Sequence, residues 1–203
     1  MKVSLLFLFV SAFSFAYAEP IFRTPDSLKN GERGEYLPKS SYKIIGVDIN
    51  SASLDDIEKV IGDAPIYKGQ HTANHLCYAN DDQKIEFTVS SLGFGYKVAR
   101  STAISQKCTR IGKSIENDAG LKIGLSKSEV LALLGKPTEI KEKSISYTYW
   151  VQETPTQVIQ NKLRKTHKLP SDLELWLDIY SQVNIGFSDN VIDEFSIHTT
   201  ETY

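Results

Sequence analysis

The chain of 203 residues lacks an excess of positive charge: it has 23 Lys and Arg against 25 Asp and Glu, a formal net charge of −2. Proteins that hold a phosphate backbone usually present a basic field to it, so binding of nucleic acid is not expected. Disorder over most of the chain is also excluded, because 41% hydrophobic and 24% charged residues are typical of a globular protein. The sequence therefore predicts a folded protein with a real core.

Motifs that would identify an enzyme are missing as well. There is no G-x-S-x-G sequence, no P-loop, and no G-x-G-x-x-G after a predicted strand. The pairs Asp55-Asp56 and Asp81-Asp82 fall in the first turn of a predicted helix and in a predicted hairpin turn, where carboxylates stabilise local structure. We therefore assign no catalytic residue and no cofactor.

Two histidines leave a minor enzymatic hypothesis open. His71 and His75 have the four-residue spacing that would bring two metal ligands together on a helix, but they lie between Gly69 and a predicted strand, without convincing further ligands. His75 also stands two residues before Cys77, and such neighbours point the same way on a strand. A small metal-dependent or thiol-dependent enzyme is the third function that we consider, and no metal site is assigned.

Long apolar runs are absent after the N-terminus, where the chain begins like an exported protein. A short positive start, Met1-Lys2, is followed by an apolar stretch from Leu5 to Phe13 and by the small residues of Ala16-Tyr17-Ala18. This is the layout of a secretory signal peptide, and its apolar part is short for a membrane span, which needs about 20 residues. We expect residues 1–18 to be removed, and an uncleaved N-terminal anchor is the alternative. The chain is then expected in the periplasm or outside the cell, without an integral membrane segment.

Cysteine is scarce, with only Cys77 and Cys108 in the chain. In an oxidising compartment an even count of two favours one intramolecular disulfide. The sequence therefore predicts a Cys77–Cys108 bridge, and a nucleophilic Cys77 thiol is the competing interpretation.

One sequence pattern occurs twice, 73 residues apart. Residues 53–62 read S-x-x-D-I-x-x-V-I-G and residues 126–135 read S-x-x-E-V-x-x-L-L-G, each followed by a proline. Serine is a good N-cap, an acid three residues later completes a capping box, and glycine suits the end of a helix. Each copy thus predicts a short capped helix, with an apolar face made of residues at i, i+3 and i+4. These residues are Ile57, Val60 and Ile61 in the first copy, and Val130, Leu133 and Leu134 in the second.

After each helix the hydrophobic period changes to two, which is typical of strands. The expected strands are 74–79, 84–90 and 94–103 in the first copy, and 144–151, 173–187 and 191–199 in the second. We therefore expect an α+β fold of two tandem units, each a short helix or helix pair on an antiparallel sheet of three to four strands. The expected domains are an extended leader at 19–42, a first unit at 43–112 and a second unit at 113–203.

The second unit contains an expected helical insertion at 154–170. It carries Lys162, Arg164, Lys165, His167 and Lys168. Two interpretations remain open, a solvated excursion and a basic arm that docks on an acidic partner.

The repeated helix motif in a chain of this layout resembles the β-lactamase-inhibitor-protein-like superfamily. That group includes small outer-membrane-assembly lipoproteins of the BamE/SmpA type. The resemblance covers residues 47–199, and its better copy is Gly124–Pro137. It implies a binding module that presents a sheet face to a protein. No cysteine lies near the expected cleavage site, and no inhibitory loop residue matches one to one.

Alternation along the strand at 173–187 divides its residues between two faces. If Leu175, Leu177 and Ile179 face the helix, the opposite face carries polar and aromatic residues, and His198 on the last strand faces the same way. Aromatic residues on a polar face match the composition of binding hot spots. The candidate protein-binding residues are Glu174, Trp176, Asp178, Tyr180, His198 and Trp150, the last with its facing left open.

We therefore expect an exported, non-enzymatic binding protein, in the concrete form of an inhibitor or immunity-type protein that binds an envelope or extracellular protein. An envelope or outer-membrane assembly factor is the alternative.

Overall fold

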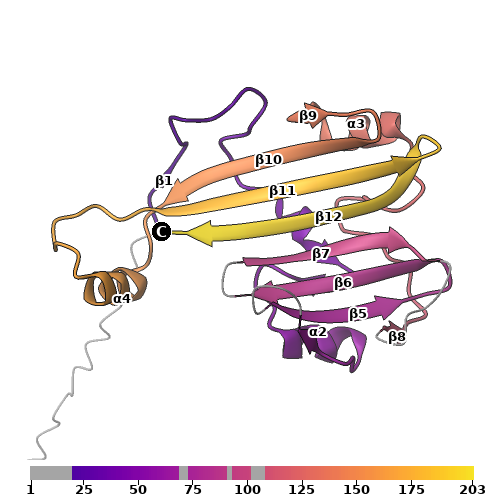
Figure 1. Ribbon diagram of the computed structural model, residues 1–203, viewed down its shortest axis with the longest axis horizontal. Coiled ribbons are helices and arrows are strands. Elements are labelled where there is room, and N and C mark those ends of the chain that lie inside the picture. Colours follow the sequence, from indigo (N-terminus) through magenta and orange to yellow (C-terminus); the bar gives the residue numbers. More distant parts are fainter. Residues whose placement is uncertain (1–19, 69–72, 91–92, 102–107) are drawn as a thin grey trace, which may run out of the picture.

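The computed structural model describes residues 20–68, 73–90, 93–101 and 108–203. Most described strands join one ten-stranded sheet with the order β1-β10-β11-β12-β7-β6-β5-β4, while β8 pairs with β5 and β9 pairs with β10 (Figure 1). Their bounds are β1 Phe22–Arg23, β4 Tyr67–Lys68, β5 Asn74–Ala79, β6 Gln83–Ser90, β7 Gly93–Arg100, β8 Thr109–Arg110, β9 Glu139–Ile140, β10 Ser144–Glu153, β11 Leu177–Ser188 and β12 Val191–Thr202. A separate pair is formed by β2 (Lys43–Ile44) and β3 (Val47–Asp48).

The prediction of two tandem units with separate sheets is wrong. β7 and β12 pair antiparallel from Gly93–Thr200 to Ala99–Glu194, so strands from both expected units continue in one sheet. The sheet is mixed rather than antiparallel throughout, because β8 runs parallel to β5. Separate units would leave β7 and β12 as edges with unpaired backbone groups, and their pairing satisfies both rows.

Helices are a small part of the described chain. They are α1 (Lys39–Tyr42), α2 (Leu54–Ile61), α3 (Lys127–Leu134) and α4 (Gln157–His167). The two predicted helices are confirmed as α2 and α3, and each begins with a complete capping box, between Ser53 and Asp56 and between Ser126 and Glu129.

The predicted apolar faces of these two helices are only partly correct. Ile57 and Val130 are fully buried, but Val60 and Leu133 are each 43% exposed. The contacts with the core are completed instead by Leu54 and Leu131, together with Ile61 and Leu134. The face that packs on the core therefore runs along Leu54, Ile57 and Ile61 in α2 and along Val130, Leu131 and Leu134 in α3.

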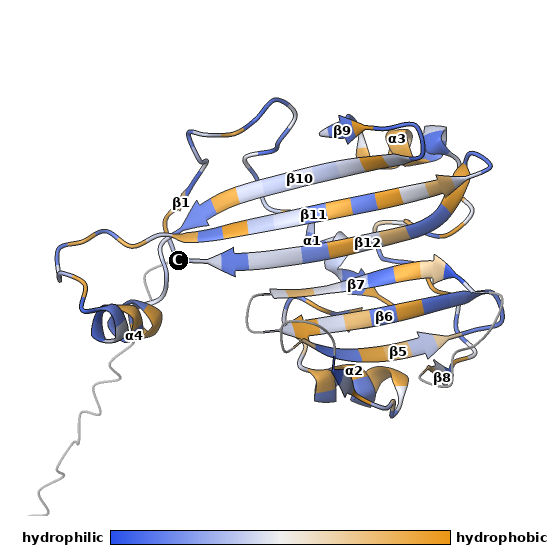
Figure 2. Cartoon of the chain, viewed as in Figure 1, coloured by the Kyte–Doolittle hydropathy of each residue, from blue (hydrophilic) through white to orange (hydrophobic). Residues whose placement is uncertain are grey.

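The two faces of the sheet differ in what covers them. Buried residues of β6, β7, β10, β11 and β12 form one core with Ile57 and Val130 of the helices. Figure 2 labels α1 between β11 and β12, and it shows hydrophobic and hydrophilic residues alternating along β11. We call the side of the sheet opposite this core the outer face.

The segment expected to be an extended leader is joined to the sheet. β1 pairs with β10 at Arg23–Gln152, and the backbone of Arg33 bridges to Tyr149. Further along, the Tyr42 hydroxyl lies 2.9 Å from the Ser181 Oγ and 3.1 Å from the Thr199 Oγ1, inside the core. These contacts satisfy polar groups that burial would otherwise leave unpaired.

Short strands cover both long edges of the sheet. β1 and β9 pair with the two ends of β10, and β4 and β8 pair with the two ends of β5. Short edge strands limit pairing with another chain through the backbone. The ends of both edge strands are therefore paired within the chain.

Candidate functional site

Strand register brings the aromatic residues of the outer face together. Trp150 of β10 lies directly opposite Tyr180 of β11, and Tyr180 lies opposite Thr200 of β12. Val151 and Ile179 occupy the neighbouring pair and therefore point to the other face. The facing of Trp150, which the sequence left open, is thus toward the outer face.

A chain of hydrogen bonds from Asp178, completed by one cation–π contact, connects the two tryptophans. The Asp178 Oδ1 accepts from Trp150 Nε1 at 3.2 Å and from Gln152 Nε2 at 2.8 Å. Gln152 Oε1 in turn accepts from Arg23 Nε at 2.9 Å, and the Arg23 guanidinium lies 3.7 Å from the centre of the Trp176 ring. We call Trp150, Asp178, Tyr180, Gln152 and Trp176 the aromatic cluster.

Arg23 and Gln152 are members of this site that sequence reasoning missed. Arg23 lies about 150 residues before Trp176 in the chain, and only the pairing of β1 with β10 brings it to the ring. The alternation of β10 places Gln152 on the same face as Trp150, and that pattern was a usable signal.

The two remaining predicted residues, His198 and Glu174, lie outside the aromatic cluster. His198 is exposed on the outer face and lies opposite Gln182, which donates a 2.9 Å hydrogen bond to the Tyr180 hydroxyl. Partial desolvation lowers the pKa of His198 below its ordinary value. Glu174 is exposed in the segment before β11 and is not brought into the cluster by strand pairing.

A shallow hollow borders the aromatic cluster. Trp150, Asp178, Tyr180 and Thr202 line it from the sheet, and Lys29 and Glu32 line it from the leader. The Glu32 carboxylate accepts a 2.7 Å hydrogen bond from the backbone of Lys29, which holds this leader turn together. The hollow combines ring faces, a carboxylate and an ammonium group, and such mixed chemistry suits a protein surface better than one small apolar ligand.

The middle of the outer face is polar and open. Asn184 and His198 are exposed there, and Lys97 pairs with Glu194 at 2.6 Å on the neighbouring strands. Gly95 lies opposite His198, and a side chain at that position would meet the His198 ring. The face is therefore free to contact another molecule beside the aromatic cluster.

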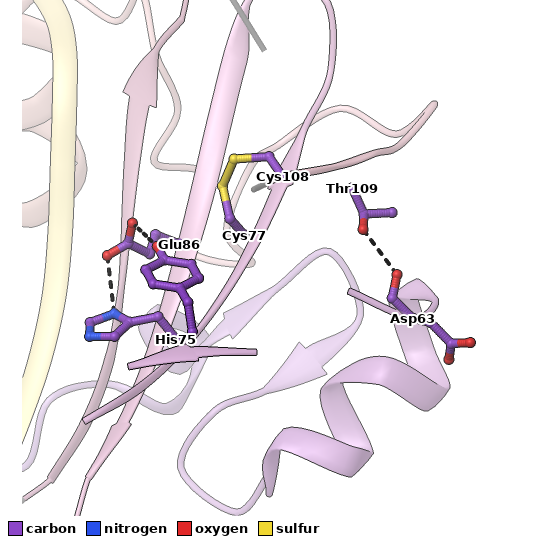
Figure 3. Close-up of a disulfide and its surroundings, with 7 residues drawn as sticks. Asp63, His75, Cys77, Glu86, Cys108 and Thr109 are labelled. Atoms are coloured by element: carbon purple, nitrogen blue, oxygen red, sulfur yellow. Dashed lines mark hydrogen bonds and ion pairs between the residues drawn. A yellow bond between two sulfur atoms is a disulfide. The ribbon is translucent and has the colours of Figure 1, made fainter. Parts of the chain in front are cut away.

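The disulfide prediction is confirmed: Cys77 and Cys108 are bonded, with their Cα atoms 4.4 Å apart (Figure 3). Cys77 is buried on β5. Thr109 follows Cys108 in the chain, and its hydroxyl donates a 3.0 Å hydrogen bond to the Asp63 carbonyl oxygen. The Cys77 sulfur is thus engaged in a bond and is not a free thiol.

His75 takes part in a polar cluster at the other end of the outer face. Its Nδ1 lies 3.1 Å from Glu86 Oε1 and 3.1 Å from Thr88 Oγ1. The Tyr67 ring stacks on the imidazole, and its hydroxyl donates to Glu86 Oε2. Desolvation, and then the bond to Glu86, raises the Tyr67 pKa above its usual range. The polar side chains of His75, Glu86, Thr88 and Tyr67 therefore form hydrogen bonds with one another.

The described residues contain no group of three or more His, Cys, Asp and Glu side chains arranged to hold a metal ion. His71 and the expected signal peptide at 1–18 lie outside the described residues. No helix in the described ranges combines the length and apolar character needed to cross a membrane.

Comparison of the chain with protein-family models, with curated proteins and with solved structures found no match. The resemblance to the β-lactamase-inhibitor-protein-like superfamily therefore stays a prediction.

Proposed function

We propose that this chain is an exported, non-enzymatic binding protein that holds a protein partner on the outer face of β10, β11 and β12. One observation carries the proposal: Trp150 and Tyr180 form a cross-strand aromatic pair on a polar face whose centre is exposed. Tryptophan and tyrosine are enriched among the residues that dominate binding energy. Their half-buried rings leave part of the aromatic surface for a partner.

The pair is pre-organised for binding. The bond from Trp150 Nε1 to Asp178 and the bond from Gln182 to the Tyr180 hydroxyl restrict both side chains. A restricted side chain loses less conformational entropy on association, so more of the contact energy appears as affinity.

The concrete form of the proposal is an inhibitor or immunity-type protein whose partner is an enzyme. Asp178 supplies negative charge beside the Trp150 ring, and Glu174 is exposed in the segment before β11, so we favour a target with a basic rim. Complementary charge mainly accelerates association and selects the partner. The disulfide supports an oxidising compartment, in agreement with export.

The test compares capture from envelope extract by the tagged protein and by two variants. Tyr180→Ala removes one ring of the pair, and Lys143→Ala changes an exposed residue near the opposite end of β10. We expect one soluble enzyme to bind the wild type and Lys143→Ala. Tyr180→Ala should lower the measured affinity for the purified enzyme about 30-fold, the effect of a hot spot worth about 2 kcal/mol.

The captured partner and its activity distinguish the inhibitor hypothesis from the assembly-factor alternative. Slowed turnover with the wild type but not with Tyr180→Ala supports an inhibitor. Stable recovery of an outer-membrane complex instead supports the assembly-factor alternative. An affinity that changes less than twofold in a folded Tyr180→Ala variant contradicts the placement of the site on this face.

A further inference from the structure

Helix α4 projects from one end of the sheet, between β10 and β11 (Figure 1). Within the described ranges, its side-chain hydrogen bonds stay inside its own excursion. Gln160 Nε2 donates to the Pro155 carbonyl oxygen at 2.8 Å, and the Arg164 guanidinium donates to the carbonyl oxygens of Pro170 and Leu173. These hydrogen bonds tie the helix to its flanking loops.

The two sides of α4 differ in exposure. One side is half-buried and faces the loops that flank the helix. Its residues are Ile159, Gln160, Leu163 and Arg164. The opposite side is exposed, and its residues follow helical spacing: Val158, Asn161, Lys162 and Lys165, with Lys168 at the C-cap. We call Val158, Lys162, Lys165 and Lys168 the basic ridge.

The basic ridge has no acidic neighbour on its own helix. From Gln157 to Lys168 the chain carries Lys162, Arg164, Lys165 and Lys168 but no Asp or Glu, and the next acid is Asp172. Cations in the last turn interact favourably with the helix dipole, which accounts for Arg164 and Lys165 in part. Lys162 lies in the middle of the helix, where that effect is weak, so the helix dipole does not balance its charge.

Contact with an external surface would stabilise α4, because the helix is short. Isolated helices shorter than about 12–15 residues are marginal in water, and α4 has 11. Thr156 at its N-terminus makes no side-chain capping bond. Contact with a surface along the basic ridge would add the tertiary contacts that such a helix usually needs.

Exposed apolar side chains adjoin the base of the same excursion. The backbone N–H of Thr154 donates to the Ile21 carbonyl oxygen at 2.9 Å, which fixes Ile21 and Phe22 beside it. These two side chains are 66% and 44% exposed, and Val158 in the ridge is 76% exposed. The Phe22 ring also packs on Tyr36, with the ring centres 5.1 Å apart, and leaves an exposed edge. Val158 shares its helix with the lysines of the basic ridge, and exposed apolar side chains together with lysines are the composition of a protein surface that lies on a membrane interface.

We propose that the basic ridge, together with Ile21 and Phe22, docks on an anionic phospholipid surface. The lysines interact with the lipid phosphates, and the apolar side chains contact the boundary of the acyl region. This docking is peripheral and does not rest on the proposed function.

The experiment measures co-sedimentation with vesicles of phosphatidylcholine containing about one third phosphatidylserine, and with pure phosphatidylcholine as the neutral surface. We expect binding to the anionic vesicles only, weakening as NaCl rises from about 0.05 to about 0.5 M. The triple variant Lys162→Gln, Lys165→Gln, Lys168→Gln should bind on the order of 100-fold more weakly, since each lysine near an anionic surface contributes about 1 kcal/mol.

The matched control removes the same number of charges elsewhere. Lys136, Lys141 and Lys143 are exposed at the opposite end of the second half of the sheet, and their replacement by Gln should leave vesicle binding within about twofold. Both triple variants should keep the wild-type melting temperature, because none of the six side chains is buried.

Three results would overturn the proposal. The first is equal binding of the two triple variants to anionic vesicles. The second is equal binding of the wild type to neutral and anionic vesicles. The third is that the wild type binds no vesicles and its basic ridge binds an acidic protein instead. Tyr180→Ala should bind vesicles like the wild type, so failure of one proposal is distinguishable from failure of the other.

Discussion

The hydroxyl of Tyr78, on β5, donates a 2.8 Å hydrogen bond to the carbonyl oxygen of Gly62, which ends α2. The second half of the chain repeats this relationship: the Tyr147 hydroxyl on β10 donates to the carbonyl oxygen of Gly135, which ends α3, at 3.1 Å. In both cases a tyrosine of the first long strand after the helix ties the helix end to the sheet. The repeat in the sequence is therefore also a repeat of contacts.

Replacing Tyr78 or Tyr147 by phenylalanine tests how much these ties stabilise the fold. Each change keeps the ring in the core and removes one hydrogen bond, so each should lower the free energy of unfolding by about 1 kcal/mol. Urea denaturation at neutral pH measures the change. The two losses should add in the double variant, because the tyrosines lie on strands at different parts of the sheet. Two variants as stable as the wild type would contradict a stabilising role.

The orientation of α2 predicts a contrast between two of its residues. Ile57→Ala should cost about 2–5 kcal/mol, because it creates a cavity at a side chain that is 1% exposed. Val60→Ala, three residues away, should cost less than about 1 kcal/mol, because its side chain is 43% exposed and its removal leaves no closed cavity. Thermal and urea unfolding of the two variants measure the contrast. Equal costs would mean that the helix is rotated from the position described.

Chemical reduction of the disulfide should lower the stability of the wild-type protein. The bridge joins residues 31 apart, and closing a loop of that length contributes about 4 kcal/mol in the chain-entropy description. Native protein should not react with a maleimide until it is reduced. The denaturation midpoint should fall after reduction and alkylation. Rapid labelling of Cys77 or Cys108 without reductant would contradict the bridge.

His198 predicts a pH dependence of stability. Desolvation lowers the pKa of its imidazole in the folded protein below the unfolded value of about 6.5. As the pH falls through that value, the unfolded chain takes up a proton first, so the free energy of unfolding decreases. Urea denaturation between about pH 8 and pH 5 should show this loss, and His198→Gln should reduce it. An unchanged slope in the variant would assign the effect to other groups.

Local features of the fold could be predicted because they depend on neighbours in the chain. The capping boxes at Ser53 and Ser126 involve residues three positions apart, and the alternation around Phe87 repeats every second residue. Such patterns carry their own geometry, since the backbone period fixes which side chains share a face. The bridge between the only two cysteines followed in the same way from composition and compartment.

Pairings between distant segments could not be predicted in the same way. Nothing in the sequence of β7 or β12 distinguishes two sheet edges from two paired neighbours, because both satisfy the same alternation. The stacking of Arg23 on Trp176 also needs β1 to reach β10, a contact with a sequence separation that local patterns do not encode. Long-range backbone pairing decided these points, because the N–H and C=O groups along β7 and β12 satisfy each other only in the folded chain.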